Sequence, residues 1–368
     1  MSQWRIATKQ WAKFFFSMIT RLLPLNMVRA LFESSMETLH RRGPDFITHR
    51  TLSKSGEKGP YHVLDPILPM PHEPIGLVIQ GPLLLQDDFT VESVRYYLRV
   101  KPQVIVIVST WEGEDAAALE RIRVLGAEIV INKKPPCSGR CNVNYQVAST
   151  RGGIERAIQL GCQHVAKTRT DQRVYSIPTL LSLSRILFDY PIRNSPLRQR
   201  QRIITTSRGT SKYGPYHLSD FFMYGDCNDM LEFWSPPLDY EAYHHLWNKR
   251  SDAKSYPEAI SMVPEHYIIR HYLLRDLDKL QYSIHAWWSI LADRFCVIDW
   301  KTLDVYWPKY EPNSERPDLA VDHHAVMHSM RFIDWLALYS RNQDCTKFLQ
   351  NNIFESFPRQ ECLNHRIF

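Results

Sequence analysis

Continuous apolar runs alternate with amphipathic runs between residues 75 and 170. The apolar runs have the length and β-branched content of strands that are buried on both faces, and they lie at 75–81, 103–110, 127–134 and 164–170. Amphipathic runs with helical spacing separate them, at 90–100, 114–126 and 143–161. Strands and helices that take turns in this way predict an α/β domain with a mainly parallel sheet.

The pattern becomes less regular after residue 178. Helices are expected over 179–189 and 264–277. Strands are expected at 202–207 and, with alternating aromatic residues, at 220–225. The residues after about 308 carry little periodicity. We therefore expect one large α/β domain over 74–310 and a C-terminal extension packed on it over 311–368.

The first 73 residues are expected to form an amphipathic helix and a connector. Their apolar and aromatic stretch is interrupted by basic residues and by Pro24, so it lacks the ~20 apolar residues of a transmembrane helix. It also lacks a signal-peptide cleavage site. Two interpretations stay open: residues 1–40 bind an anionic membrane surface, or the helix packs on its own domain. The expected location is cytoplasmic, and in the first case peripheral on the inner face of the cytoplasmic membrane.

Composition changes this picture little. The formal net charge of +6 suits anionic partners such as phosphates or a lipid surface, and solvated basic faces explain it equally well. The 10 Trp and 18 Tyr residues suit both sugar-binding sites and cores. Seven scattered cysteines favour a reducing compartment over a disulfide framework. Cys137 and Cys141 lack the spacing and the second ligand pair of a zinc site.

The common phosphate-binding loops are missing from the sequence. The end of the first expected strand, "GLVIQGPLLL", has no G-x-G-x-x-G, and no G-x-x-x-x-G-K-[ST] occurs anywhere in the chain. The basic run "LRQRQR" at 197–202 has no nucleic-acid motif beside it, so no nucleic acid is expected as a partner. If phosphates bind, a divalent cation or arginine side chains must neutralise them.

One acidic residue between two arginines follows the fourth expected strand. In "HVAKTRTDQRVYSIP", residues 164–178, Asp171 lies two residues from Arg169 and two from Arg173. Open parallel sheets bind ligands at the carboxyl ends of their strands, and two arginines would lower the pKa of the Asp171 carboxyl. Asp171 is therefore either a cation ligand beside arginines that bind a diphosphate, or a member of an ion pair.

Six motifs occur in order along the chain: "IGLVIQGPL", "VIVSTWEGE", "NVNYQVASTRGGI", "KTRTDQRVY", "SDFFMYGD" and "PEHYI". Together they resemble the WavE lipopolysaccharide-synthesis family, over roughly residues 74–275. The resemblance implies a glycosyltransferase with a GT-A-like α/β fold. Such an enzyme would move a sugar from a nucleotide-sugar donor to a polysaccharide or lipopolysaccharide core acceptor, which is a glycan or glycolipid.

The resemblance also implies a metal ion. GT-A-like folds commonly hold the donor diphosphate through Mn²⁺ or Mg²⁺ on an Asp-x-Asp motif at the end of a central strand. This chain departs from that motif, because the residue two before Asp171 is Arg169. Either Asp171 holds the metal with other help, or Arg169 and Arg173 replace the metal.

Further candidates for the donor site follow the first three expected strands. Gln80 and Gly81 suit contacts to the nucleotide base or ribose, with a plain turn as the alternative. Trp111 suits stacking on a base or sugar, and a half-buried core residue is the alternative. Asn144 opens a helix whose N-terminus favours anions or is simply capped, and Arg151 of the same helix is a phosphate candidate.

Two carboxylates are candidates for acid–base chemistry. Inverting transfer to a hydroxyl needs one carboxylate that takes the acceptor proton. Asp220 precedes the aromatic strand, and Glu265 follows Pro264, where it also suits a first-turn acid facing the helix dipole. A second hypothesis removes catalysis: a membrane-associated scaffold or binding protein of a polysaccharide assembly complex. The missing second acidic residue of the metal motif favours it.

Overall fold

The computed structural model describes residues 74–100, 104–193, 198–240, 255–261, 263–308 and 328–340, with a few residues between 18 and 35. The chain divides into two compact units, Met1–Ser53 and Lys54–Phe368, and the fold below is that of the second unit. Most of the N-terminal segment expected to bind a membrane lies outside the described residues. Among the residues that are described, no helix has the length and apolar character needed to cross a membrane.

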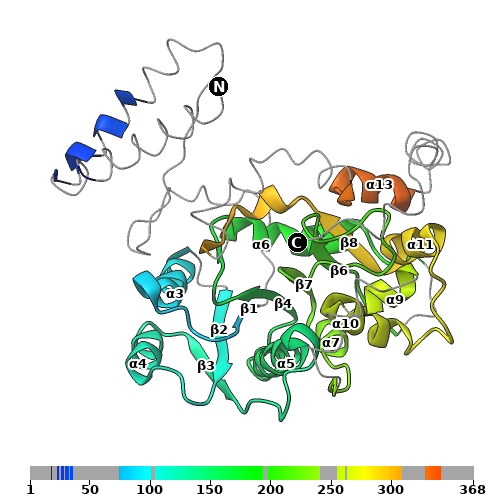
Figure 1. The fold of residues 1–368 in the computed structure, drawn as a ribbon, viewed down its shortest axis with the longest axis horizontal. Coiled ribbons are helices and arrows are strands. Elements are labelled where there is room, and N and C mark those ends of the chain that lie inside the picture. The colour runs from blue at the N-terminus through cyan, green and yellow to red at the C-terminus, as the bar shows by residue number, and fades with distance from the viewer. Residues whose placement is uncertain are drawn as a thin grey trace, which may run out of the picture. The chain divides into compact units, whose positions relative to one another are not determined.

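A seven-stranded sheet forms the centre of this unit, in the order β3-β2-β1-β4-β7-β6-β8 (Figure 1). The strands are β1 (Ile75–Gln80), β2 (Val104–Trp111), β3 (Glu128–Asn132), β4 (His164–Arg169), β6 (Ile203–Thr206), β7 (Met223–Asp226) and β8 (Phe295–Ile298). Strands β3, β2, β1 and β4 pair in parallel, as do β6 and β8, while β7 is antiparallel to β4 and β6. The predicted α/β class with a mainly parallel sheet is therefore confirmed.

The register of the central strands brings their carboxyl ends together. Gln80, the last residue of β1, pairs with Ser109 of β2 and with Arg169 of β4. Just beyond these pairs, the amide of Gly81 donates to the Ser109 carbonyl over 3.1 Å, and the amide of Thr170 donates to the Gln80 carbonyl over 3.0 Å. Gly81 adopts a φ of 120°, which a residue with a side chain rarely takes. The chain therefore leaves these strands at their carboxyl ends, which is where open parallel sheets bind ligands.

Helices cover the faces of the sheet (Figure 1). They are α3 (Phe89–Val100), α4 (Ala116–Val124), α5 (Val143–Gln159), α6 (Ile177–Asp189), α7 (Cys227–Phe233), α9 (Tyr256–Ser261), α10 (Pro264–Leu273), α11 (Ile284–Arg294) and α13 (Phe332–Ser340). Short elements are the 3-10 helices η1 (Gln86–Asp88), η2 (Arg140–Asn142) and η3 (Trp300–Leu303), and the strand pair β5 (Arg173–Val174) and β9 (Val305–Tyr306).

Helix α5 packs directly on β1 and β2. A methyl group added at Gly153 would lie 2.4 Å from a carbon of Val78 and 3.1 Å from one of Ser109, so only glycine lets the helix come this close. Glycine lowers helix propensity, and here close packing on the sheet offsets that loss.

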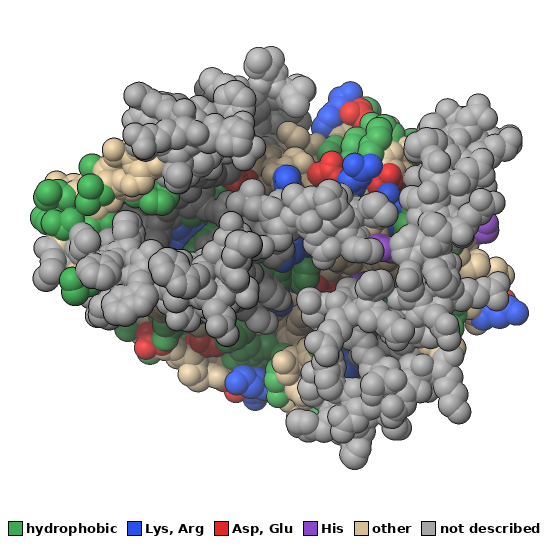
Figure 2. Space-filling model, turned by 45° about the horizontal axis from the view of Figure 1, so that its top comes forward, with side chains coloured by type: hydrophobic (Ala, Val, Ile, Leu, Met, Phe, Trp, Pro, Cys, Tyr) green, Lys and Arg blue, Asp and Glu red, His purple; other side chains and the backbone are tan. Residues whose placement is uncertain are grey.

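The described part of the C-terminal segment belongs to the same core. The Trp335 indole of α13 donates to the Phe295 carbonyl at the start of β8 over 2.8 Å. Asp334 forms an ion pair of 2.8 Å with Lys212, and both side chains are nearly buried. This pair ties α13 to the loop that leads into Asp220. On the face drawn in Figure 2, the described surface carries basic, acidic and apolar side chains interspersed with one another.

Candidate functional site

A buried lysine, Lys167, lies at the centre of the candidate site. It is the fourth residue of β4, between Val78 of β1 and Met223 of β7. Its Nζ donates to the backbone oxygen of Asp220 and lies 4.6 Å from the centre of the Trp234 ring. Burial lowers the pKa of Lys167 to about 8.

Three carboxylates and one arginine act electrostatically on this lysine. Beyond the effect of burial, the charges of Asp220, Asp171 and Glu265 raise the pKa of Lys167, and the charge of Arg169 lowers it. We call these five residues the Lys167 cluster. The sequence suggested these three carboxylates separately, for metal binding and for acid–base chemistry. Their charges act on the same lysine side chain.

Asp220 is the most deeply buried carboxylate of the cluster. Its exposed fraction is 3%, and its backbone oxygen is fixed by the Lys167 ammonium. Its carboxylate oxygen Oδ2 is buried and accepts no hydrogen bond from the described residues. Buried carboxylate oxygens normally have a donor. An oxygen without one is suited to take a proton from a bound hydroxyl group.

Asp171 and Arg169 form a bidentate ion pair. The Nε and Nη2 atoms of Arg169 donate to the two carboxylate oxygens of Asp171 over 2.8 and 3.0 Å. Each side chain keeps about a fifth of its surface exposed. Of the two interpretations that the sequence left open for Asp171, the ion pair is the arrangement present in this structure.

An aromatic ring lies beside the guanidinium of Arg169. The Arg169 guanidinium lies 5.3 Å from the centre of the Trp307 ring, and Arg208 lies 5.8 Å from the same ring. Phe221, next to Asp220, packs edge-on against Trp307 at 4.9 Å. Arginines beside aromatic rings supply bidentate donors for phosphate and flat surfaces for a base or a sugar.

The side chains at the carboxyl ends of these strands do not form a preformed cation site. Within the described ranges, no three His, Cys, Asp or Glu side chains converge closely enough to hold a metal ion. Both oxygens of Asp171 are taken by Arg169. Each carboxylate oxygen has a second lone pair, so a cation at Asp171 would share this carboxylate with Arg169.

Three more of the predicted donor residues lie at the ends of β1 and β2. Gln80 is nearly buried, and its Oε1 accepts from the Ser149 hydroxyl of α5 over 2.9 Å. Trp111 is also nearly buried and meets the ring of Tyr145 edge-on at 5.6 Å. Gly81 forms the turn that leaves β1 beside Thr170. The sheet register thus places Gln80 and Gly81 next to the end of β4, while Trp111 lies one strand further away on β2.

The other three predicted donor residues have contacts elsewhere. The Asn144 amide exchanges two hydrogen bonds with the Asp239 backbone, of 2.7 and 2.8 Å. Arg151 is exposed and pairs with Glu155 one turn along α5. Arg173 is buried and donates to the Ser93 hydroxyl over 2.9 Å and to the Phe89 carbonyl of α3 over 3.2 Å. These contacts tie the three side chains to α3, to α5 and to the loop after α7.

Lys167, Arg208 and Trp307 were missed by the sequence-based prediction. Lys167 carried a usable signal, because a lysine inside an apolar run that reads as a doubly buried strand needs a reason. Arg208 and Trp307 carried none, because they lie far from Asp171 in the chain and in segments without periodicity.

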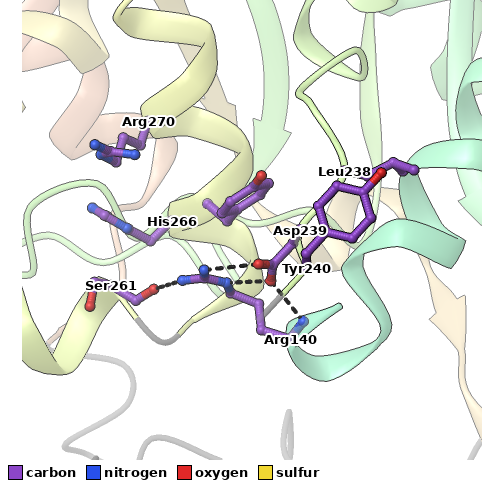
Figure 3. Close-up of a pocket in the computed structure, with 8 residues that line it drawn as sticks. Arg140, Leu238, Asp239, Tyr240, Ser261, His266 and Arg270 are labelled. Carbon is purple, nitrogen blue, oxygen red and sulfur yellow. Dashed lines mark hydrogen bonds and ion pairs between the residues drawn. The ribbon is translucent and has the colours of Figure 1, made fainter. Parts of the chain in front are cut away.

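A pocket of about 490 Å³ lies beside α10 (Figure 3). His266, Tyr267 and Arg270 of that helix line it, together with Arg140 and Asp239. Glu265 of the Lys167 cluster directly precedes His266, so the pocket and the cluster share the first turn of α10.

Comparison with known proteins assigns the chain to a family. Among curated proteins no match is found. The family model described as WavE lipopolysaccharide synthesis matches residues 75–362. The match spans the seven-stranded sheet, the Lys167 cluster and the pocket beside α10. The chain therefore belongs to the WavE lipopolysaccharide synthesis family.

Proposed function

We propose that this protein is a glycosyltransferase that uses a nucleotide-sugar donor in lipopolysaccharide synthesis. The observation that carries the proposal is the Lys167 cluster, in which the charges of three carboxylates and an arginine act on one buried lysine of the central strand β4. Carboxylates supply acid–base chemistry, arginines bind diphosphate, and the carboxyl ends of parallel strands are where ligands bind.

The donor diphosphate would bind Arg169 and Arg208, with Trp307 and Phe221 beside the base or the sugar. The Arg169 and Arg208 guanidinium groups lie 5.3 and 5.8 Å from the centre of the Trp307 ring, which brings two positive charges together. A diphosphate would compete with Asp171 for Arg169. Their charge stabilises the leaving nucleoside diphosphate as the bond from the anomeric carbon to phosphate oxygen breaks. Gln80 and Trp111, at the neighbouring strand ends, extend the donor site toward the nucleotide.

Asp220 or Glu265 would act as the general base. The chosen carboxylate takes the proton of the acceptor hydroxyl while that oxygen forms its bond to the anomeric carbon. Asp220 is the stronger candidate, because it is the more deeply buried of the two carboxylates and its backbone is held by Lys167. Lys167 holds the Asp220 backbone and therefore acts as a positioning residue.

A divalent cation would share the charge of the donor diphosphate. Mg²⁺ or Mn²⁺ needs only one or two protein carboxylates beside substrate phosphates, and Asp171 is the residue that would supply one. Because Asp171 is bound to Arg169, none of the steps above depends on the metal. Residues 1–40 would bring the enzyme to an anionic membrane surface, where a glycolipid acceptor lies.

Donor turnover tests this proposal. The purified full-length chain is incubated with a panel of nucleotide sugars and with lipopolysaccharide core acceptors, and release of nucleoside diphosphate is measured. We expect turnover of one donor, and a fall of about 10²- to 10⁴-fold in Asp220→Asn or Glu265→Gln, whichever is the base. Glu155→Gln, an exposed carboxylate of α5, is the matched control. A folded protein that turns over no donor would support the scaffold hypothesis instead.

A further inference from the structure

We propose that the pocket beside α10 binds the acceptor sugar through an anionic group on that sugar, a phosphate or a carboxylate. This inference rests on the proposed glycosyltransferase function and names the class of its acceptor. Four features of the pocket support it: its fixed wall, its charge, its aromatic rings and its position beside Glu265.

One wall of the pocket is held in place by a buried ion pair. The Nε and Nη2 atoms of Arg140 donate to the two oxygens of Asp239 over 2.6 and 3.2 Å, and the Arg140 amide donates to the same carboxylate over 2.9 Å. Nη1 of Arg140 donates to the Ser261 carbonyl (Figure 3). The guanidinium lies 4.7 Å from the centre of the Tyr267 ring. Each guanidinium nitrogen of Arg140 therefore donates within the protein, which fixes the orientation of this side chain.

Arg270 supplies the charge for recognition. It is exposed, lies one turn after His266 on α10, and lines the pocket. No carboxylate among the described residues lies within ion-pair distance of it. The charges of Arg140 and Asp239 cancel in their ion pair. The net charge of this wall is therefore the single positive charge of Arg270. Burial and then the charges of Arg270 and Arg140 lower the pKa of His266 to about 3, which keeps that imidazole neutral.

The remaining wall suits a sugar ring. Tyr240 lines the pocket and is 74% exposed, whereas Tyr267 is buried with its ring against Arg140. Aromatic rings pack on the apolar faces of sugars while their hydroxyl groups stay in water. A volume of about 490 Å³ falls within the range of ligand pockets. A phosphate or carboxylate on the sugar would match the guanidinium of Arg270.

The pocket is also in the right place for an acceptor. Glu265 and His266 are consecutive residues, and the charge of Glu265 acts on Lys167 in the cluster assigned to donor and base. An acceptor held against His266 would therefore contact the same first turn of α10 that carries Glu265, the second candidate base.

Direct binding to the full-length chain tests the inference without any need for turnover. The probes are glucose 6-phosphate, glucuronate, methyl glucoside and inorganic phosphate, measured by saturation-transfer NMR and calorimetry. The variants are Arg270→Gln and, as a control of equal charge change, Arg123→Gln on α4. Nucleotide-sugar binding is measured on the same samples.

We expect at least one anionic sugar to bind about tenfold more tightly than methyl glucoside and inorganic phosphate. Arg270→Gln should remove that preference, while Arg123→Gln and nucleotide-sugar binding stay unchanged. Equal binding of neutral and anionic sugars, equal binding of phosphate alone, or an anion preference that survives in Arg270→Gln would overturn the inference. If wild type binds nucleotide sugars but none of the anionic sugars, this acceptor class is rejected and the proposed donor function is not affected.

Discussion

Lys167 sits where an apolar side chain is normally found. Strand β4 is flanked by β1 and β7, and the exposed fraction of Lys167 is 0%. Burying an ammonium group costs free energy unless partners replace water. Here the Asp220 carbonyl, the face of Trp234 and three nearby carboxylates do so only in part, because the pKa of Lys167 still falls to about 8.

This pKa makes stability depend on pH in a defined direction. Between the folded value of about 8 and the ordinary lysine value of 10.5, the unfolded chain binds the proton and the folded chain does not, so stability rises with pH. Relative to Lys167→Met, wild type should gain about 2 kcal/mol of unfolding free energy from about pH 7 to about pH 10. Urea unfolding of both proteins at several pH values measures the difference. A constant difference would show that Lys167 is not buried as a titrating group.

At the scale of single residues, the sequence indicated candidate side chains but not their contacts. Asp171, Asp220 and Glu265 were nominated from residue type and strand position, and they do act on one lysine. The pairing of Asp171 with Arg169 rather than Arg173 could not be predicted, because both arginines are two residues away. Arg173 instead turns under α3, a contact that depends on residues 80 or more positions earlier in the chain.

At the scale of elements, helix α5 sets the distance between the sheet and the layer above it. Gly152 and Gly153 lower the helix propensity of this segment, yet the helix runs from Val143 to Gln159, close to the predicted 143–161. The hydrophobic pattern was therefore sufficient to predict the helix. The reason for the glycines was not visible in it, because the reason is contact with Val78 and Ser109 across the layer.

Gly153→Ala should destabilise the protein in spite of alanine's higher helix propensity. The added methyl group meets Val78 of β1 at 2.4 Å, so α5 or the strand must move. We expect a loss of about 1–3 kcal/mol in unfolding free energy, measured by urea or thermal unfolding. Glu155→Ala, on the exposed side of the same helix, should change stability by less than about 0.5 kcal/mol. A Gly153→Ala variant as stable as this control would contradict the close packing of α5 on the sheet.

Strand ends were the least predictable feature of the elements. The aromatic strand was expected at 220–225, and β7 covers Met223–Asp226. The strand begins three residues later than expected because its pairing with β4 ends at Lys167 and Met223. Residues 220 to 222 therefore lie outside the strand, and this is what places the Asp220 backbone next to Lys167.

At the scale of the whole molecule, the candidate site is assembled from distant parts of the chain. It lies at the carboxyl ends of the central strands and combines residues 167–171, 208, 220–221, 265 and 307. The parallel topology, predictable from alternating strands and helices, explains why Gln80, Trp111 and Asp171 lie near these ends. It does not explain Trp307, which comes from a segment whose sequence has little periodicity.

The measurement that tests the central claim most directly is calorimetric titration with nucleoside diphosphates and nucleotide sugars, with and without Mn²⁺. It uses wild type, Arg169→Gln, Asp171→Asn and the control Arg123→Gln. Strengthening by Mn²⁺ that Asp171→Asn abolishes would assign the metal to Asp171. The account predicts that one nucleotide class binds, and that Arg169→Gln weakens it by about tenfold or more while Arg123→Gln does not. Binding of no nucleotide, or binding to Arg169→Gln as tight as to the control, would contradict a donor site at the end of β4.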